Sequence, residues 1–361
     1  MAQMSARWRV PAAIALVLIA VVVALYLLRG EIALRLTERM AQRNLSADLT
    51  QELPDGLHAA VCGSGSPLTD PTRAGPCLAV VAGKRVFVVD AGEGSAEVLS
   101  GMGLRPGAIE QLFLTHFHSD HIDGLGAMAL QRWAGGAAKT PLPVHGPPGV
   151  ERVTAGFNEA YALDSTYRVG HHGPKIVPPE GFGLAAQPFA MPGPGGAVVY
   201  DQCGVKVTAF PVDHDPARPA VGYRFDYRGR SLVISGDTRA IAEVTRQAQG
   251  TDLLVHEALS PRLTKVVEDA ARQAGRNNVA QVMADIPDYH ASPEEAAKVA
   301  ADSKARALLL THMVPPLRMR ALEGPFLGEA RRAFSGLLWV ARDGQVVSMP
   351  AGGTLVRLNR R

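Results

Sequence analysis

The 361-residue sequence contains little cysteine and almost no surplus of charge. Three cysteines are too few to hold a small secreted domain together by disulfide bonds. The 37 glycines and 26 prolines follow no fixed period, which excludes a collagen-like chain. Of the net charge of +3, residues 1–54 carry +2. The rest therefore lacks the basic surplus typical of proteins that grip a long phosphate backbone.

Residues 10–28 form an uncharged apolar run, VPAAIALVLIAVVVALYLL. As a helix with a rise of about 1.5 Å per residue, this run spans roughly 28 Å, close to the hydrocarbon thickness of a bilayer. A cleaved signal peptide and a buried core helix are the alternatives, but no small-x-small cleavage site follows Leu28 and the run has no polar stripe. The sequence predicts a tail at 1–9, a transmembrane anchor at 10–28, a connector at 29–54 and a folded domain at 55–361.

The sequence gives opposing indications for the orientation of the anchor in the membrane. Two arginines precede the run and four follow it, so a strict positive-inside count keeps the body in the cytoplasm. Short N-terminal tails commonly stay inside while the body is exported. We therefore favour a single-pass inner-membrane protein with its folded domain on the periplasmic side. Cys62 and Cys77 flank one loop and could pair in an oxidising compartment; three independent buried thiols are the alternative.

Short β-branched runs alternate with helical patterns along the body. Strands are predicted at 57–62, 77–81, 86–89, 109–115, 205–211, 221–227, 231–235, 253–255, 307–311 and 337–341. Helical periodicity occurs at 150–163, 240–249, 260–274 and 293–303. This mixture predicts a layered α/β or α+β fold.

A dense group of possible metal ligands follows the predicted strand at 109–115. The sequence there reads Thr-His-Phe-His-Ser-Asp-His, with His116, His118, Asp120 and His121 within six residues. Imidazole and carboxylate groups are ligands of divalent cations. Three histidines and an aspartate cannot all be buried without partners, because unpaired buried polar groups are costly. The group predicts a metal site.

Three further candidates follow other predicted strands. His214 comes after 205–211, Asp237 after 231–235, and His312 after 307–311. With the first group they make seven ligands, about the number that two metal ions sharing one bridging carboxylate require.

These residues and several further motifs resemble a known family. The metallo-β-lactamase-fold superfamily carries HxHxDH followed by His, Asp and His in this order. Similarity to ribonuclease Z and its relatives extends to Gly63–Pro67, Arg73–Pro76, Asp90–Gly94, Leu114–His121, Gly222–Phe225, His256–Ala258 and Tyr289–Ser292. The resemblance implies a four-layer αββα sandwich over about residues 57–315, preceded here by the transmembrane helix. It is far more specific for the fold than for a substrate.

The resemblance also implies how the ligands divide. One metal ion would lie on His116, His118 and His214, and the second on Asp120, His121 and His312, with Asp237 bridging them. Zinc is the usual metal in the superfamily, and manganese or iron are alternatives. Two such cations would make hydroxide available from a bridging water near neutral pH.

The resemblance assigns further residues to the reaction. His290 resembles the histidine of the family's His-Ser-Thr loop, which contacts the scissile phosphate; here the loop reads His-Ala-Ser, and capping of the next helix is the alternative role. His256 and Glu257 match the family's His-Glu-Ala-Thr element, and Glu257 is a candidate to orient His290. Asp120 is counted with these catalytic residues, and Asp90 is expected beside the ligand group.

Other polar residues have less specific interpretations. Arg318 and Arg320 follow His312 and either bind an anion or form a solvated surface. The pair His171-His172, together with His145 and His58, is expected to lie outside the metal site.

The substrate is expected to differ from transfer RNA. Ribonuclease Z holds transfer RNA with a protruding flexible arm, and no basic, Gly-rich arm is present in residues 145–200. We therefore predict a hydrolase of small anionic esters, phosphodiesters first, with arylsulfatase or lactonase activity as alternatives. Ribonuclease Z-type cleavage and a non-catalytic metal-binding role are ranked below these, nucleic acid is an unlikely partner, and a homodimer is a possibility.

Overall fold

The computed structural model describes residues 4–359, which belong to two compact units, one ending at Ala47 and one beginning at Asp48. The second unit starts before the predicted residue 55, because the short helix α2 (Leu49–Glu52) is built into the body. Leu49 and Leu53 are buried in its core. The Lys84 ammonium donates hydrogen bonds to the carbonyl oxygens of Thr50 and Leu53 at the end of α2.

The first unit is the helix α1 (Met4–Ser46), which runs through the predicted anchor and most of the connector without a break. Its apolar side chains between Ile14 and Leu28 are exposed. Among residues 4–359 it is the one helix long and apolar enough, by length and composition alone, to be a candidate membrane span. A 34-residue stretch of it, Ala13–Ser46, meets that test.

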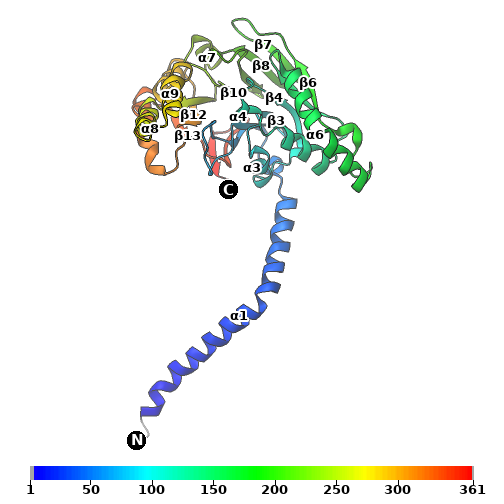
Figure 1. Cartoon of the computed structure of the whole chain (residues 1–361), viewed down its shortest axis with the longest axis vertical. Helices are drawn as coiled ribbons and strands as arrows, with labels where there is room; N and C mark the ends of the chain where they lie inside the picture. Colours follow the sequence, from blue (N-terminus) through cyan, green and yellow to red (C-terminus); the bar gives the residue numbers. More distant parts are fainter. Residues whose placement is uncertain (1–3, 360–361) are drawn as a thin grey trace. The chain divides into compact units, whose positions relative to one another are not determined.

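The second unit contains two β-sheets (Figure 1). The eight-stranded sheet has the order β15–β14–β1–β2–β3–β4–β5–β6, and the seven-stranded sheet the order β13–β12–β11–β10–β9–β8–β7. The strands of the larger sheet are β1 Gly56–Gly63, β2 Cys77–Ala82, β3 Arg85–Val89, β4 Ile109–Phe113, β5 Leu142–Gly146, β6 Leu184–Pro188, β14 Gln345–Pro350 and β15 Val356–Asn359. Those of the smaller sheet are β7 Ala197–Gln202, β8 Val205–Pro211, β9 Val221–Tyr227, β10 Arg230–Ile234, β11 Leu253–Leu259, β12 Ala307–Val314 and β13 Leu337–Val340.

Three apolar cores separate four layers. One core, which includes Val61, Phe113 and Tyr223, fills the space between the sheets. The helices lie outside: α3 Ser95–Gly101, α4 Ser119–Ile122, α5 Leu125–Leu130, α6 Val150–His172, α7 Ala242–Gln247, α8 Pro261–Gln273, α9 Asn277–Asp285, α10 Pro293–Asp302, α11 Glu323–Leu327 and α12 Ala330–Ala333. A second core lies under the helices on the large sheet and a third under those on the small sheet. The predicted four-layer αββα sandwich is confirmed.

The strand directions bring loops from both sheets to one edge. Strands β3 to β6 run parallel in one sheet and β10 to β13 run parallel in the other. Carboxyl ends of parallel strands lie at the same edge of a sheet. The His/Asp candidates follow β4, β8 and β10 or lie near the carboxyl end of β12, so the fold gathers them there.

The cysteine alternatives are decided by the structure. Cys62 at the end of β1 and Cys77 at the start of β2 form a disulfide bond across a separation of 15 residues. The alternative of three buried thiols is wrong, since Cys203 is also exposed, in the turn between β7 and β8. The disulfide closes the 63–76 loop, whose position beside Asp120 is described below.

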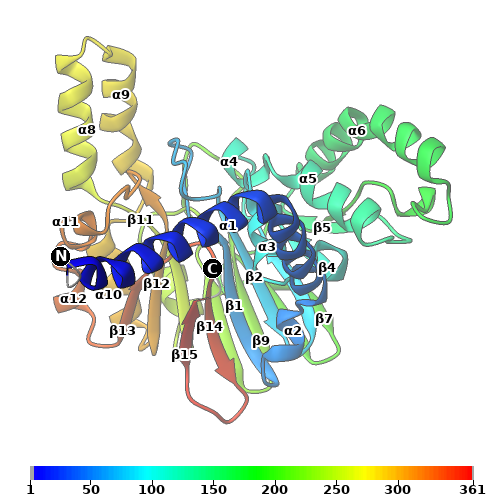
Figure 2. The same cartoon turned by 90° about the horizontal axis from the view of Figure 1, so that it is seen from below.

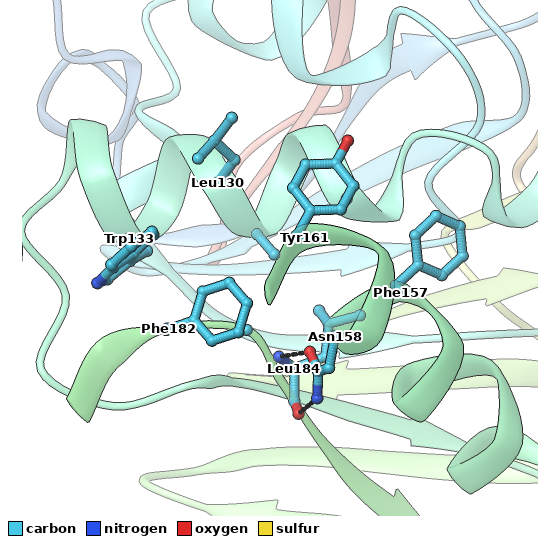
Figure 3. A pocket seen from close by; sticks show the side chains of 10 residues that line it. Leu130, Trp133, Phe157, Asn158, Tyr161, Phe182 and Leu184 are labelled. Carbon is cyan, nitrogen blue, oxygen red and sulfur yellow. Dashed lines mark hydrogen bonds between the residues drawn. The ribbon is translucent and has the colours of Figure 1, made fainter. Parts of the chain in front are cut away.

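Two elements project from the body, one on each side of α4 (Figure 2). One is the hairpin of α8 and α9, and the other is α6, which extends to His172, beyond the predicted residue 163. The middle of α6 packs at a narrow apolar pocket whose lining includes Phe157, Tyr161, Trp133 and Phe182 (Figure 3). There the Asn158 side chain bonds both the N–H and the C=O of Leu184.

Candidate metal centre

The first four candidate ligands leave the large sheet together. After β4, the Thr115 N–H donates to Asp90 Oδ1 at 2.8 Å, which fixes the start of the loop. His116 is 1 % exposed, whereas His118 is open to solvent. The loop then enters the short helix α4, which carries Asp120 and His121 on its buried side.

Asp237 is delivered by a tight turn after β10. Gly236 there has φ +62°, and a Cβ on it would lie 2.9 Å from the Val221 carbonyl oxygen and 3.0 Å from Thr115 Cβ. A larger residue is therefore strained in both conformation and space. This close approach places Asp237, 3 % exposed, against the loop that holds His116.

His312 reaches the site through an irregularity in β12. Leu308 and Leu310 face the helix-covered core, so strict alternation would turn His312 the same way. Instead the register with β11 shifts at this point and His312 has φ +49°. Such a bulge re-aims a side chain. It turns the imidazole towards Asp120 and Asp237.

Four donor atoms form the first group. His118 Nδ1 lies 3.0 Å from His116 Nε2 and 3.3 Å from His214 Nε2. Asp237 Oδ2 is 3.9 Å from His116 Nε2 and 3.8 Å from His214 Nε2. These are the residues that the sequence predicts for one metal ion, together with the predicted bridging carboxylate.

The second group shares Asp237. His312 Nε2 lies 3.2 Å from both Asp120 Oδ2 and Asp237 Oδ2. His121 Nε2 lies 3.6 Å from Asp120 Oδ2 and 3.3 Å from Asp237 Oδ2. A single oxygen, Asp237 Oδ2, therefore lies within 4 Å of a ring nitrogen from each of four histidines, where a bridging ligand would be.

The donor set fits two divalent cations. Imidazole nitrogens at about 2.0–2.1 Å from a tetrahedral Zn²⁺ are separated from one another by roughly 3.4 Å, and the observed donor separations lie around that value. His121 Nε2 is also buried without a hydrogen-bond partner. A buried ring nitrogen left unpaired is costly unless a cation or a proton satisfies it.

Neighbouring groups set the orientation of the rings. His214 Nδ1 donates to the Tyr289 carbonyl oxygen at 3.0 Å, and His121 Nδ1 donates to Asp90 Oδ2 at 2.8 Å. Each bond leaves the Nε2 lone pair directed at the donor group. Asp90 thus occupies the place expected for it. The Thr115 hydroxyl lies 3.0 Å from His116 Nδ1 and holds that ring in the same way. Neither this hydroxyl nor the Tyr289 carbonyl was predicted, because neither group stands out in a sequence.

The protein charges around the centre favour a cation. Burial lowers the pKa of His121, but the carboxylates of Asp237, Asp90 and Asp120 outweigh it and raise that pKa well above its ordinary value. Burial would raise the pKa of Asp237, but His312 and His121 hold it well below its usual range. The His121 shift expresses the negative field of the three carboxylates, which a bound cation would also relieve. The Asp237 shift keeps that carboxyl group ionised and therefore able to bind a cation.

His290 and Glu257 lie together beside the second group. His290 Nδ1 is 3.1 Å from Glu257 Oε1, which also accepts the Ala291 N–H at 2.9 Å. The His290 ring is 5.5 Å from the His312 ring, centre to centre. Burial lowers the pKa of His290, but Glu257 more than compensates and raises it to about 9. The alternative that His290 caps α10 is not realised, because the capping residue is Ser292.

His256 is the one predicted site residue that the structure does not bring to the centre. In β11 it alternates with Glu257 and lies between Leu254 and Ala258, both of which belong to the helix-covered core. Its Nδ1 donates to the Glu257 carbonyl oxygen at 2.8 Å. None of its atoms belongs to the donor groups found among the described residues.

The remaining histidines lie outside the centre, as expected. His58 hydrogen-bonds Pro54 and Ser348, and His145 bonds Gln111 and stacks on Phe113 at 4.7 Å. His171 and His172 are exposed at the far end of α6.

A cavity of about 700 Å³ opens beside Asp120. Its walls include the disulfide-closed loop, from Ser66 to Gly75, and the exposed carboxylates of Glu93, Glu97 and Asp123. The loop places Arg73 in this wall, where the guanidinium donates to Ser64 Oγ and the Ala341 carbonyl oxygen. The surface next to the metal centre on this side is therefore acidic.

Comparison with known proteins agrees with this architecture. Residues 85–313 match the β-lactamase superfamily domain. A ribonuclease Z of Mycobacterium avium (strain 104) is 34 % identical over 289 residues, which cover 80 % of this chain and 96 % of that protein. The metallo-β-lactamase-fold protein YhfI from Bacillus subtilis aligns with TM-score 0.58 at 18 % identity, covering 81 % of this chain and 99 % of that one. The short form of human tRNase Z aligns with TM-score 0.57 at 21 % identity over 81 % and 99 %.

The two-sheet sandwich with its His/Asp centre therefore defines a metal-dependent hydrolase of the metallo-β-lactamase fold. Within that class, the chain belongs to the β-lactamase superfamily domain family, in which its relatives include ribonuclease Z proteins.

Proposed function

We propose that this protein is a phosphodiesterase that acts on small anionic diesters at a dinuclear centre. The observation that carries the proposal is the position of Asp237 Oδ2 within 4 Å of a ring nitrogen from each of four histidines. The relatives are named ribonuclease Z, and a ribonuclease cleaves phosphodiester bonds, which supports this bond type. The two predicted ligand sets are completed by six other residues, His116, His118, Asp120, His121, His214 and His312, and His290 also offers a donor atom near Asp237 and His312.

Two bound divalent cations would supply an activated water and stabilise the negative charge that develops on the phosphate oxygens. The chain's own residues do the rest. Asp237 lies between the two ligand groups and fixes their positions relative to each other. Glu257 raises the pKa of His290 against the effect of burial, which favours a protonated ring that can donate a hydrogen bond or a proton to a phosphate oxygen. Glu257 positions that ring through its bond to Nδ1.

Zinc is the metal we propose for the centre. Five imidazole nitrogens and two carboxylates are a donor set that zinc accepts in tetrahedral sites with an open position. Manganese or iron are the alternatives, since imidazole and carboxylate groups bind these ions as well.

RNA cleavage is the second candidate function, favoured by 34 % identity to ribonuclease Z over 80 % of the chain. We rank it second because the cavity beside Asp120 exposes the carboxylates of Glu93, Glu97 and Asp123, which would repel a polyanion along that wall. The domain beyond residue 54 also carries a net charge of only +1.

A substrate panel tests the proposal. We expect the metal-loaded protein to hydrolyse bis-p-nitrophenyl phosphate, and to do so faster than p-nitrophenyl sulfate or a chromogenic lactone. Cleavage of a precursor transfer RNA at high kcat/KM would favour the second candidate. Activity confined to sulfate or lactone substrates would contradict the proposal and indicate an arylsulfatase or lactonase.

We further propose that α1 anchors the protein in the inner membrane with the body outside the cytoplasm. The disulfide between Cys62 and Cys77 supports this, because such bonds persist in oxidising compartments. We expect the pair Cys62→Ala/Cys77→Ala to lower the free energy of unfolding by about 3 kcal/mol, the value for a closed loop of 15 residues.

The measurement is urea unfolding of the body with and without reductant, with Cys203→Ala as the control that should change nothing. Labelling of thiols in intact cells tests the location. If Cys62 and Cys77 are reduced in vivo, or if a C-terminal reporter is active only in the cytoplasm, the exported orientation is wrong.

A further inference from the structure

A second cavity, of about 470 Å³, adjoins the acidic one at the 72–73 segment. The two cavities share Thr72 and Arg73 in their walls. Four arginines from three separate parts of the chain line the second cavity, which we call the arginine cavity: Arg73, Arg318, Arg320 and Arg342. Such convergence of like charges is unfavourable unless anions lie among them.

Two of these charges are already balanced by the protein. Arg342 forms an ion pair with Glu323. Arg73 lies near Asp343, the one carboxylate in the wall of the arginine cavity, and near Asp70. Asp343 accepts hydrogen bonds from the N–H groups of Ser64 and Ala74. Arg73 and Arg342 are therefore held by the protein's own carboxylates and are not free to bind a ligand.

Within residues 4–359, the other two charges have no counterion. Arg318 donates to the neutral Thr69 carbonyl oxygen at 3.2 Å, and the Arg320 side chain forms no hydrogen bond or ion pair with that part of the chain. Both side chains are exposed at the cavity, next to Leu317, which is buried in the core under the small sheet. They follow His312 by six and eight residues on the same segment.

We propose that the arginine cavity is a second anion site, which binds a phosphate group through Arg318 and Arg320. Guanidinium groups bind phosphate oxygens in pairs, with charge-assisted hydrogen bonds, and two uncompensated guanidiniums match a phosphate dianion. The phosphate group belongs either to the substrate of the proposed phosphodiesterase, as a second phosphate besides the scissile one, or to a separate phosphorylated ligand. The first case rests on the proposed function; the binding site itself does not.

Binding of inorganic phosphate to the metal-loaded full chain tests the site. Equilibrium dialysis should find one phosphate more per chain in the wild type than in Arg318→Ala/Arg320→Ala. The control Arg262→Ala removes an exposed arginine from α8 and should keep the wild-type count. Arg318→Lys/Arg320→Lys keeps the charges but loses the paired geometry, and should weaken this site roughly tenfold.

Two chromogenic diesters distinguish the sources of the phosphate. One is the p-nitrophenyl ester of thymidine 5′-phosphate, and the other carries an additional 3′-phosphate. If the site serves the substrate, the double alanine variant raises KM about tenfold for the second ester only and leaves kcat unchanged. If both KM values stay unchanged while the extra phosphate is lost, a separate ligand occupies the site. Equal phosphate counts in wild type and double variant would overturn the proposal, even where the first ester is hydrolysed normally.

Discussion

Asp237→Asn should reduce phosphodiester hydrolysis by about 10³-fold or more and remove most of the bound metal, because one oxygen serves both halves of the centre. The carboxylate is 3 % exposed, and the four histidines around it would be left with weaker amide contacts. Metal content by elemental analysis and kcat on bis-p-nitrophenyl phosphate are the two readouts.

Asp213→Asn is the matched control for that variant. Asp213 lies on the same side of the small sheet, beside the ligand His214, and pairs with Arg239 on the surface. It should keep the metal content and most of the activity. Retention of both metals and full activity in Asp237→Asn would contradict the bridging position that the structure gives this residue.

His290→Ala should lower kcat by about 10²–10⁴-fold while leaving the metal content unchanged, as expected for a proton donor that is not a ligand. Glu257→Gln should lower it by roughly 10–100-fold, because it loses the charge that orients and protonates the ring. Glu257 carries an unpaired buried oxygen, so unfolding curves of both variants are needed beside the kinetics.

The dependence of kcat on pH shows whether Glu257 acts by positioning and protonating His290 or only by stabilising the fold. Glu257 raises the pKa of His290 to about 9, so the protonated ring is present below that pH and is lost as the pH rises through it. In Glu257→Gln the alkaline limb of kcat should therefore move to lower pH. His256→Gln, on the helix-covered face of β11, should leave the limb in place. A limb that does not move in Glu257→Gln would contradict the role assigned to this pair.

The strands that position the centre could be predicted from the sequence, because each is an apolar run followed closely by a histidine or an aspartate. The runs at 205–211 and 221–227 match β8 and β9 at both ends. Five strands were missed: β5, β6, β7, β14 and β15. The short strands β5 and β6 each contain proline, which weakens a strand pattern. Helix α9 was missed as well, because its capping residue Arg276 gives no N-cap signal.

The sequence predicted which residues form the candidate site, but not the orientation of every side chain. The predicted strand ended at residue 255, whereas β11 continues to Leu259. His256 was therefore grouped with Glu257, although strand alternation points the two side chains to opposite faces of β11. The same limit applies to His312, whose place depends on a bulge in β12. Anion binding by Arg318 and Arg320 was one of two interpretations of the sequence, but the sequence could not show that Arg73 and Arg342, which are far apart along the chain, line the same cavity.

Anomalous X-ray scattering from crystals of the full chain, grown without added chelator, tests the central claim most directly. The account predicts two strong peaks, one among His116, His118 and His214 and one among Asp120, His121 and His312, with Asp237 in contact with both. A single peak elsewhere, or no peak in protein that hydrolyses a diester, would contradict it.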